Sequence, residues 1–178
     1  MGQRTISVIE IHQEEKTEIR RVAYHKQWGH GTETASALLG MLQCQFFTPN
    51  CGEFQEGIEA ETYKKRLTEP EKTHPSMSLY FSEEDLHEYL LDSGKIDMKR
   101  VIHNHDNNNG GVYLTIYMDK YGIIREGTLD FYLGYEDIEE GEQEGDKVSM
   151  QNYFDRFSDA YSTIPYRELF KENGIEAK

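Results

Sequence analysis

The sequence contains only two cysteines, Cys44 and Cys51, in 178 residues. Two cysteines make neither a disulfide framework nor a full set of zinc ligands, so we expect reduced thiols in a cytoplasmic protein. No apolar run is long enough for a signal segment or a membrane span, and neither location is expected. The chain also has only four prolines and a single tryptophan, Trp28.

Basic residues are in deficit as well. The chain has 19 Lys and Arg against 33 Asp and Glu, which gives a formal net charge of −14. Because phosphate contacts are made by Lys and Arg, this balance argues against direct binding of nucleic acid. An acidic surface provides solubility or attracts a basic partner protein, and a protein that imitates the charge of DNA is one such case.

Aromatic residues compensate for a modest hydrophobic share. Hydrophobic residues make up 37% of the chain, but these include twelve Tyr and eight Phe. Aromatic rings bury a large area each, so the chain is able to form a core. The length suits a single domain over residues 1–178.

The first half of the chain predicts a β-hairpin followed by a helix. Strand-forming residues flank a polar turn, which predicts strands near residues 5–12 and 17–26. Apolar residues then recur at helical spacing over residues 33–47, after the candidate N-cap Thr32. Residues 53–78 fit no template and are expected to be irregular.

The second half predicts a short helix, three strands and two further helices. Ser82–Asp85 is a variant capping box that opens the short helix, and Ser93–Gly94 ends it. Gly127 is expected to mark a β-bulge in the last strand. The remaining elements are expected as strands over residues 100–103, 112–118 and 123–135, an acidic loop over 136–147, and helices that begin at Ser149 (or Asp146) and at Pro165.

Strands and helices are therefore segregated along the chain and the strands are joined by hairpins. This order predicts an α+β fold with a largely antiparallel sheet. The sheet is expected to combine the N-terminal hairpin with a three-strand meander, packed with three to four helices.

The stretch from His103 to Gly111 is the most informative in the chain, with two imidazoles, a carboxylate and four amide side chains. On an extended segment His103 and His105 would point to one side, and together with Asp106 they suit zinc or iron. A plain turn from Asn107 onward explains the same residues, since Asn and Gly tolerate left-handed backbone angles. The turn is the preferred interpretation and the metal site is the alternative.

A second candidate site lies where the hairpin leads into the first helix. Gly29 and Gly31 let a ligand approach the backbone, and His30 adds a donor ahead of the free N–H groups of the helix. A tight turn that places Trp28 in the core explains the same glycines. If a ligand binds, the expected binding residues are Trp28, Gly29, His30, Gly31, Thr32, Arg100, Asn104 and Asn107.

The stretch Tyr24–Gly31 (YHKQWGHG) resembles the opening of small phage and prophage proteins of unknown function. In those proteins an aromatic-rich Arg-Gln-Trp stretch leads, after a few residues, to Gly-His-Gly. Here the intervening residues are missing and Lys26 stands where Arg is usual. The resemblance covers about a quarter of the chain and rests on a short motif. It implies origin in a mobile element and a role in host interaction or immune evasion that acts by binding.

Common catalytic fingerprints do not occur in the sequence: it has no phosphate loop, nucleophile elbow or dinucleotide-binding motif. The triplets His30-Gly31-Thr32 and His74-Pro75-Ser76 match the pattern of two-histidine phosphoesterases, but neither is predicted on a central strand. No cofactor is identified by the sequence.

We therefore expect a non-enzymatic binding protein in the cytoplasm of a host cell. Its expected partner is a host protein or a small anionic molecule such as a nucleotide, with no direct role for nucleic acid or membrane. Two alternatives stay open. One is a metal-dependent hydrolase built on His103, His105 and Asp106, and the other is an acidic decoy of a nucleic-acid-binding protein. The sequence also leaves open whether the chain forms a homo-oligomer.

Overall fold

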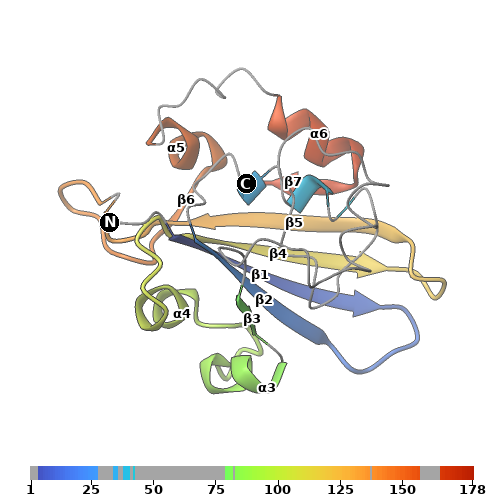
Figure 1. The fold of residues 1–178 in the computed structure, drawn as a ribbon. Coiled ribbons are helices and arrows are strands. Elements are labelled where there is room, and N and C mark those ends of the chain that lie inside the picture. Colours follow the sequence, from blue (N-terminus) through green and yellow to red (C-terminus); the bar gives the residue numbers. More distant parts are fainter. Residues whose placement is uncertain are drawn as a thin grey trace, which may run out of the picture.

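One mixed β-sheet organises the chain (Figure 1). The structure is a computed structural model and describes residues 4–27, 34–35, 38–40, 42, 79–81, 83–136, 138–156 and 165–178. The seven strands lie in the order β3-β2-β1-β4-β5-β6, with β7 also beside β5. They are β1 (Arg4–Gln13), β2 (Arg20–Gln27), β3 (Leu79–Phe81), β4 (Gly111–Met118), β5 (Ile124–Tyr132), β6 (Lys147–Val148) and β7 (Ile175–Ala177).

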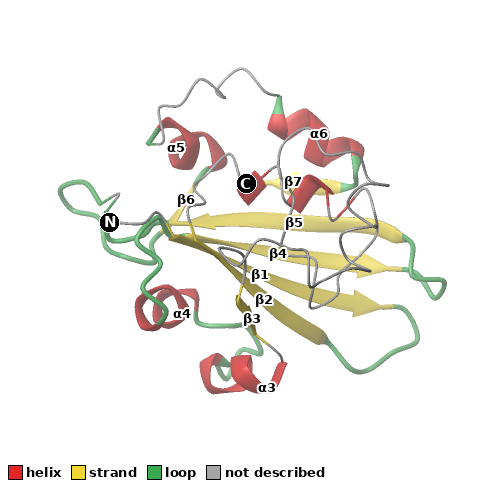
Figure 2. Ribbon diagram, in the orientation of Figure 1, coloured by secondary structure: helices red, strands yellow, loops and turns green. Residues whose placement is uncertain are grey.

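Helices lie on both faces of this sheet (Figure 2). The α5/α6 face is covered by α5, α6 and the described helical residues 34–35, 38–40 and 42, which fall within the helix predicted over residues 33–47. The α3/α4 face is covered by α3, η2 and α4. The helices are α3 (Glu83–Leu86), the 3-10 turn η2 (His87–Tyr89), α4 (Met98–Asn104), α5 (Met150–Asp155) and α6 (Tyr166–Glu172).

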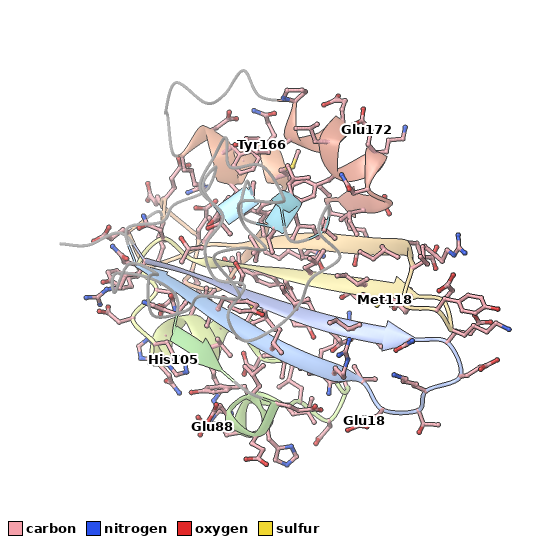
Figure 3. The ribbon with its side chains drawn as sticks, turned by 45° about the vertical axis from the view of Figure 1, so that its right-hand side comes forward. Glu18, Glu88, His105, Met118, Tyr166 and Glu172 are labelled. Carbon is pink, nitrogen blue, oxygen red and sulfur yellow. The ribbon has the colours of Figure 1, made fainter. Side chains whose placement is uncertain are left out.

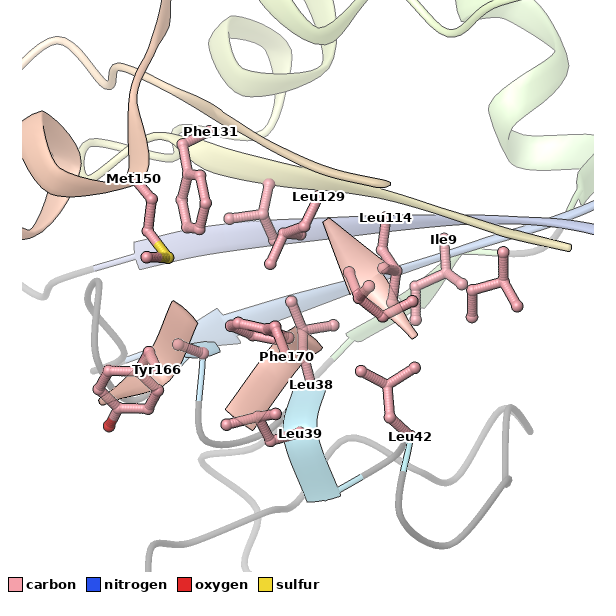
Figure 4. Packing of buried hydrophobic residues seen from close by; sticks show 14 of the residues in the cluster. Ile9, Leu38, Leu39, Leu42, Leu114, Leu129, Phe131, Met150, Tyr166 and Phe170 are labelled. Carbon is pink, nitrogen blue, oxygen red and sulfur yellow. The ribbon is translucent and has the colours of Figure 1, made fainter. Parts of the chain in front are cut away.

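The larger core lies on the α5/α6 face (Figure 4). Ile9, Leu114 and Leu129 come from three neighbouring strands and point to this face, where Leu38 and Phe170 pack against them. Each of these side chains is almost wholly buried. Burying one such side chain stabilises a fold by about 1.5–3 kcal/mol, so this layer provides much of the stability.

The smaller core lies on the α3/α4 face. Ile6 and Val8 of β1 alternate with the residues that face α5 and α6, and they pack against Leu86, Val101 and Ile102. The period-two alternation of a strand explains why β1 contributes to both cores.

The predicted α+β class and the N-terminal hairpin are confirmed. β1 and β2 are antiparallel neighbours from Arg4 beside Gln27 to Ile11 beside Arg20. The predicted helix start at Ser149 is also confirmed, because its hydroxyl accepts a hydrogen bond from the N–H of Asn152. The region expected to be irregular, residues 53–78, lies outside the described residues.

The sheet is mixed, whereas the sequence predicted a largely antiparallel one. β1 and β4 run parallel from Ile6 beside Gly111 to Gln13 beside Met118, and β5 and β7 are also parallel. A meander does exist, but it is β4-β5-β6, and its last strand begins at Lys147 inside the predicted acidic loop.

The strand predicted over residues 100–103 is wrong, because these residues belong to α4. The side chain of Asp97 accepts a hydrogen bond from the N–H of Arg100 and so caps the first turn. Met98, Val101 and Ile102 follow at helical spacing and are buried against the sheet. Burial of this apolar face outweighs the strand preference of the β-branched pair.

The bulge predicted at Gly127 is also displaced. The register shifts between Tyr117, which lies beside Glu126, and Met118, which lies beside Ile124, so the extra residue is Arg125. Gly127 is instead a point of close approach, since a Cβ there would collide with the carbonyl oxygen of Thr115 on β4 and would lie 2.5 Å from Cδ1 of Ile175 on β7. The glycine therefore makes room for both neighbouring strands.

Candidate functional site

The asparagine corner, Asn107–Asn109, joins α4 to β4 beside the start of β1. All three amide side chains are buried, at 0%, 2% and 4% exposure. The N–H of Arg4 donates to Oδ1 of Asn108 at 2.8 Å and of Asn109 at 3.1 Å. The hydroxyl of Tyr153 donates to the carbonyl of Asn109. Asn108 and Asn109 therefore hold the first strand in place, a role that the turn interpretation did not include. The left-handed backbone angles on which that interpretation relied occur at Asp106 and Gly110 and not at the asparagines.

Asn107 differs from its two neighbours. Within the described residues, neither polar atom of its buried amide has a hydrogen-bond partner in good geometry, and Nδ1 of His25 has none either, although the two side chains lie close together. Burial lowers the pKa of His25, and the nearby amide of Asn107 opposes part of that shift. An unsatisfied buried polar group costs about 1–3 kcal/mol, and such groups in native proteins often have a ligand or water as their partner.

The proposed metal ligands do not converge. His103 lies on α4 and its Nδ1 is 3.0 Å from Oε2 of Glu144. His105 lies just beyond the helix and its Nε2 is 3.0 Å from the hydroxyl of Tyr89. The extended segment that would have turned both imidazoles to one side is thus helical, where residues two apart diverge by about 200°.

Asp106, the third proposed ligand, pairs with Arg4 and accepts a hydrogen bond from the hydroxyl of Tyr135. Within the described part of the chain, no three His, Cys, Asp or Glu side chains form a group that could hold a metal ion. The premise of the metal hypothesis, shared orientation of His103 and His105, is therefore wrong.

Arg100 and Asn104 of the predicted ligand site meet at Tyr89. The guanidinium of Arg100 lies 5.4 Å from the centre of the Tyr89 ring, and Nδ2 of Asn104 donates to its hydroxyl at 3.4 Å. Neither is joined to Asn107 by a hydrogen bond. The predicted residues Trp28, Gly29, His30, Gly31 and Thr32 lie outside the described residues.

The end of β2 lies close to one of the two segments that contain predicted ligand residues. Gln27 is the last described residue before Trp28 and pairs with Arg4. Because Arg4 is bonded to Asn108 and Asn109, β2 ends beside the asparagine corner.

A polar network that the sequence analysis missed lies on the α3/α4 face, centred on the buried carboxylate of Glu10. The hydroxyl of Tyr113 donates to Oε2 of Glu10 at 2.6 Å and Nε of Arg21 donates to the same oxygen at 2.8 Å. Nε2 of His12 lies 2.7 Å from Oε1. Arg21 also donates to the carbonyl of Gly94 and so ties the network to the loop before α4.

The network shifts the pKa values of its members. Burial pushes the pKa of Glu10 upward, but the hydrogen bonds from Tyr113, His12 and Arg21 and the charge of Arg21 outweigh it, so the pKa is lowered. Burial, together with the adjacent Glu10 carboxylate, raises the pKa of Tyr113. Glu10 is therefore a carboxylate at neutral pH, held among donors.

At the hairpin end of the sheet, which Met118 marks in Figure 3, the surface holds a hollow of about 430 Å³. We call its lining the hairpin-end surface: Glu14, Tyr117, Met118, Asp119, Lys120, Tyr121, Arg125 and Glu126.

Two tyrosines of the hairpin-end surface are strongly exposed, Tyr121 at 78% and Tyr117 at 42%. Lys120 places its ammonium 5.2 Å from the centre of the Tyr121 ring. Asp119 is committed to the turn. Its carboxylate accepts hydrogen bonds from the N–H of Ile123, the guanidinium of Arg125 and the N–H of Tyr121, and these bonds lower its pKa. The turn is thus fixed, while the rings of Tyr117 and Tyr121 keep exposed area that is open to a partner.

A signal for this region was present in the sequence. Ile6, Val8, Glu10 and His12 occupy alternate positions of β1 and therefore the same face of the sheet. Two apolar residues followed by two titratable ones on a single strand face indicate where the core ends and a polar surface begins.

Comparison with known protein families, curated proteins and solved structures finds no match in any of the three. None of the helices in the described ranges is both long enough and apolar enough to span a bilayer. Inferences about function therefore rest on the geometry above.

Proposed function

We propose that the chain acts by binding a partner protein with a basic surface, through the hairpin-end surface. The observation that carries this proposal is the hollow of about 430 Å³ flanked by the exposed rings of Tyr117 and Tyr121. Tyrosine is enriched in protein interfaces because its ring offers a large apolar area and a polar tip.

The charge of the chain supports a basic partner. The net charge is −14, and the hairpin-end surface itself carries the acids Glu14, Asp119 and Glu126 against the bases Lys120 and Arg125. Complementary charge steers the encounter of two proteins and disfavours partners of the wrong sign. The contact of Lys120 with the Tyr121 ring is an example, within the chain, of a cation bound by this surface.

The resemblance of Tyr24–Gly31 to phage and prophage proteins makes host proteins of the cytoplasm the first class to screen. An acidic decoy that occupies a nucleic-acid-binding protein is a special case of this proposal. Steep loss of binding with rising salt would identify that case, because screening weakens exposed charge pairs.

The test compares tagged wild-type protein with the double variant Tyr117→Ala/Tyr121→Ala in capture from a host lysate, read by quantitative mass spectrometry. Basic proteins are expected to be captured by the wild type and lost by the double variant. Tyr135→Ala is the matched control, because Tyr135 is 44% exposed, donates to Asp106 and does not line the hollow. Equal capture by all three proteins, or no capture of basic proteins, would contradict the proposal.

A second candidate function is the binding of a small polar molecule at the asparagine corner. It is favoured by the buried amide of Asn107, which has no hydrogen-bond partner, and by the unpartnered Nδ1 of His25. An amide presents one donor and one acceptor side by side and so matches the edge of a nucleobase.

Thermal-shift measurements with nucleosides and nucleotides test this candidate, since a ligand that binds only the folded state raises Tm. The expected result is a rise in Tm for the wild type and for Asn152→Ala, an exposed asparagine elsewhere, but not for Asn107→Leu. No shift with any of these compounds, or equal shifts in all three proteins, would remove the candidate.

A further inference from the structure

Three side chains form a row across neighbouring strands on the α3/α4 face. His12 on β1 lies beside Tyr117 on β4, and Tyr117 lies beside Glu126 on β5. Adjacent strands are about 4.8 Å apart, so the three side chains are direct neighbours. Because β4 lies between β1 and β5, His12 and Glu126 flank the Tyr117 ring on opposite sides.

One face of the Tyr117 ring is already occupied. The imidazole of His12 stacks on it, with ring centres 4.7 Å apart and an angle of 23° between the planes. His12 is held in turn by Glu10, which Arg21 and Tyr113 fix from the other side. The Tyr117 ring is thus supported by a chain of contacts that runs from the exposed ring through His12 to the buried Glu10.

The opposite face of the Tyr117 ring turns toward β5 and Glu126. Within the described residues, no hydrogen bond or ion pair engages the exposed Glu126 carboxylate. Tyr117 thus offers a ring face and Glu126 offers a carboxylate, one strand apart. A planar cation is able to contact both groups at once. An arginine guanidinium stacks on an aromatic face and offers a fork of N–H donors to a carboxylate, whereas a lysine ammonium is a compact charge that cannot do both equally well.

We infer that the row formed by His12, Tyr117 and Glu126 is a recognition site for an arginine side chain of the partner. This inference rests on the proposed function and names the group that the hairpin-end surface selects. Tyr117 and Glu126 contact the guanidinium, and His12 is a positioning residue that acts through the Tyr117 ring.

The test measures binding of a short Gly/Ser peptide that carries several arginines and of its lysine counterpart with equal charge. Because overall charge is the same, the ratio of the two affinities reports the guanidinium alone. The wild type is expected to bind the arginine peptide about two- to fivefold more tightly, the effect of one exposed contact, because only the guanidinium stacks on the ring and pairs with the carboxylate at once. Tyr117→Leu and Glu126→Gln are expected to reduce this ratio toward one.

Matched controls separate recognition from general charge and from folding. Tyr135→Leu and Glu139→Gln change exposed residues of the same types away from the row and are expected to leave the ratio unchanged. Tm of every variant is measured alongside, so that loss of fold is recognised directly.

The role of His12 is tested by restoring the stack without the hydrogen bond to Glu10. His12→Ser is expected to lower the arginine-to-lysine ratio and His12→Phe to restore it, because phenylalanine also covers the Tyr117 ring. A residue that only stabilised the fold would change Tm in both variants and leave the ratio unaltered.

Equal affinity for the two peptides overturns the arginine assignment and leaves the proposed function standing. Failure of both peptides to bind also overturns it. In that case the lysate comparison tests the proposed function separately. If the capture of basic proteins depends on Tyr117 and Tyr121, the proposed function stands. If it does not, the proposed function and the arginine assignment both fail.

Discussion

On the α5/α6 face of the sheet, β1 contributes the buried side chains Ile9 and Ile11, between the half-buried polar residues Ser7 and Gln13. On the α3/α4 face the same strand contributes Ile6 and Val8, then Glu10 and His12. The helices of the α3/α4 face pack on Ile6 and Val8, whereas Glu10 is buried in a polar network and His12 is half-buried. The middle of β1 is thus apolar on one face and changes from apolar to polar on the other.

This difference shows how one strand serves stability and recognition together. Ile9 and Ile11 anchor β1 in the larger core, and hydrogen bonds hold the polar side chains Glu10 and His12 on the opposite face. Rigid, exposed side chains lose little entropy on binding, which favours their use in recognition. The predictions below test this division between the two faces.

The largest effect is expected from the apolar face. Phe131 is fully buried between the sheet and α5, where it contacts the rings of Tyr153 and Phe154. Phe131→Ala should lower the free energy of unfolding by about 3–5 kcal/mol, because it leaves a cavity in the core. Urea unfolding measures this, with Tyr117→Ala on the open face as the comparison. Similar losses of unfolding free energy in Phe131→Ala and Tyr117→Ala would contradict the difference between the two faces.

The next largest effect is expected at Glu10, whose side chain is 8% exposed. Glu10→Gln should lower stability at neutral pH by about 1.5–3 kcal/mol, because charged hydrogen bonds to Arg21 and His12 are lost. The pKa of Glu10 is lowered in the folded state, so its contribution is complete above the unfolded value of 4.5. That contribution is lost as the pH falls through the lower folded pKa.

Thermal unfolding across the acidic range measures this dependence. The wild type should lose Tm more steeply than Glu10→Gln as the pH falls below the unfolded value. Glu139→Gln, which changes an exposed acid of the loop, should keep the slope of the wild type. Parallel curves for the wild type and Glu10→Gln would show that this carboxylate is not coupled to folding.

A smaller effect separates two adjacent asparagines. Asn108→Ala removes the nearer of the two acceptors for the N–H of Arg4 and should cost about 1 kcal/mol. Asn107→Leu removes a buried amide that has no partner, and should leave Tm unchanged or raise it. Differential scanning calorimetry of the two variants provides the comparison. Equal destabilisation would mean that Asn107 has a structural role as well.

The smallest effect is expected at Tyr121, the most exposed ring of the hairpin-end surface. Tyr121→Ser should change the free energy of unfolding by no more than about 0.5 kcal/mol, since the ring is mostly in water. Urea unfolding measures it. A loss above about 1 kcal/mol would show that the ring belongs to the core of the hairpin and is not reserved for a partner.

The sequence predicted those elements whose signals are local. The hairpin of β1 and β2, the strand β4 and the Ser149 cap each depend on neighbouring residues alone. The short strands β6 and β7 were not predicted as such, because two or three residues carry no usable period and pair with β5 only after the chain has folded. The parallel pairing of β1 with β4 is similarly invisible in local patterns.

The candidate site was predicted less well for the same reason. The asparagine turn was correctly favoured, but its role in holding Arg4 depends on a strand about a hundred residues earlier in the chain. Glu10, His12, Tyr117 and Glu126 are dispersed over three strands, and only the sheet register brings them together. Such a site has no compact motif and becomes visible only when coordinates are available.

The parallel contact between β1 and β4 also has a kinetic consequence. Ile6 and Gly111 lie side by side although about a hundred residues separate them along the chain. Closing so long a loop costs about 4 kcal/mol of chain entropy before any contact compensates for it. The β1-β2 and β4-β5 hairpins should therefore form before β1 pairs with β4. Until that pairing occurs, the apolar edges of these strands are exposed. Refolding of this small protein is expected to be slow for its size and sensitive to protein concentration.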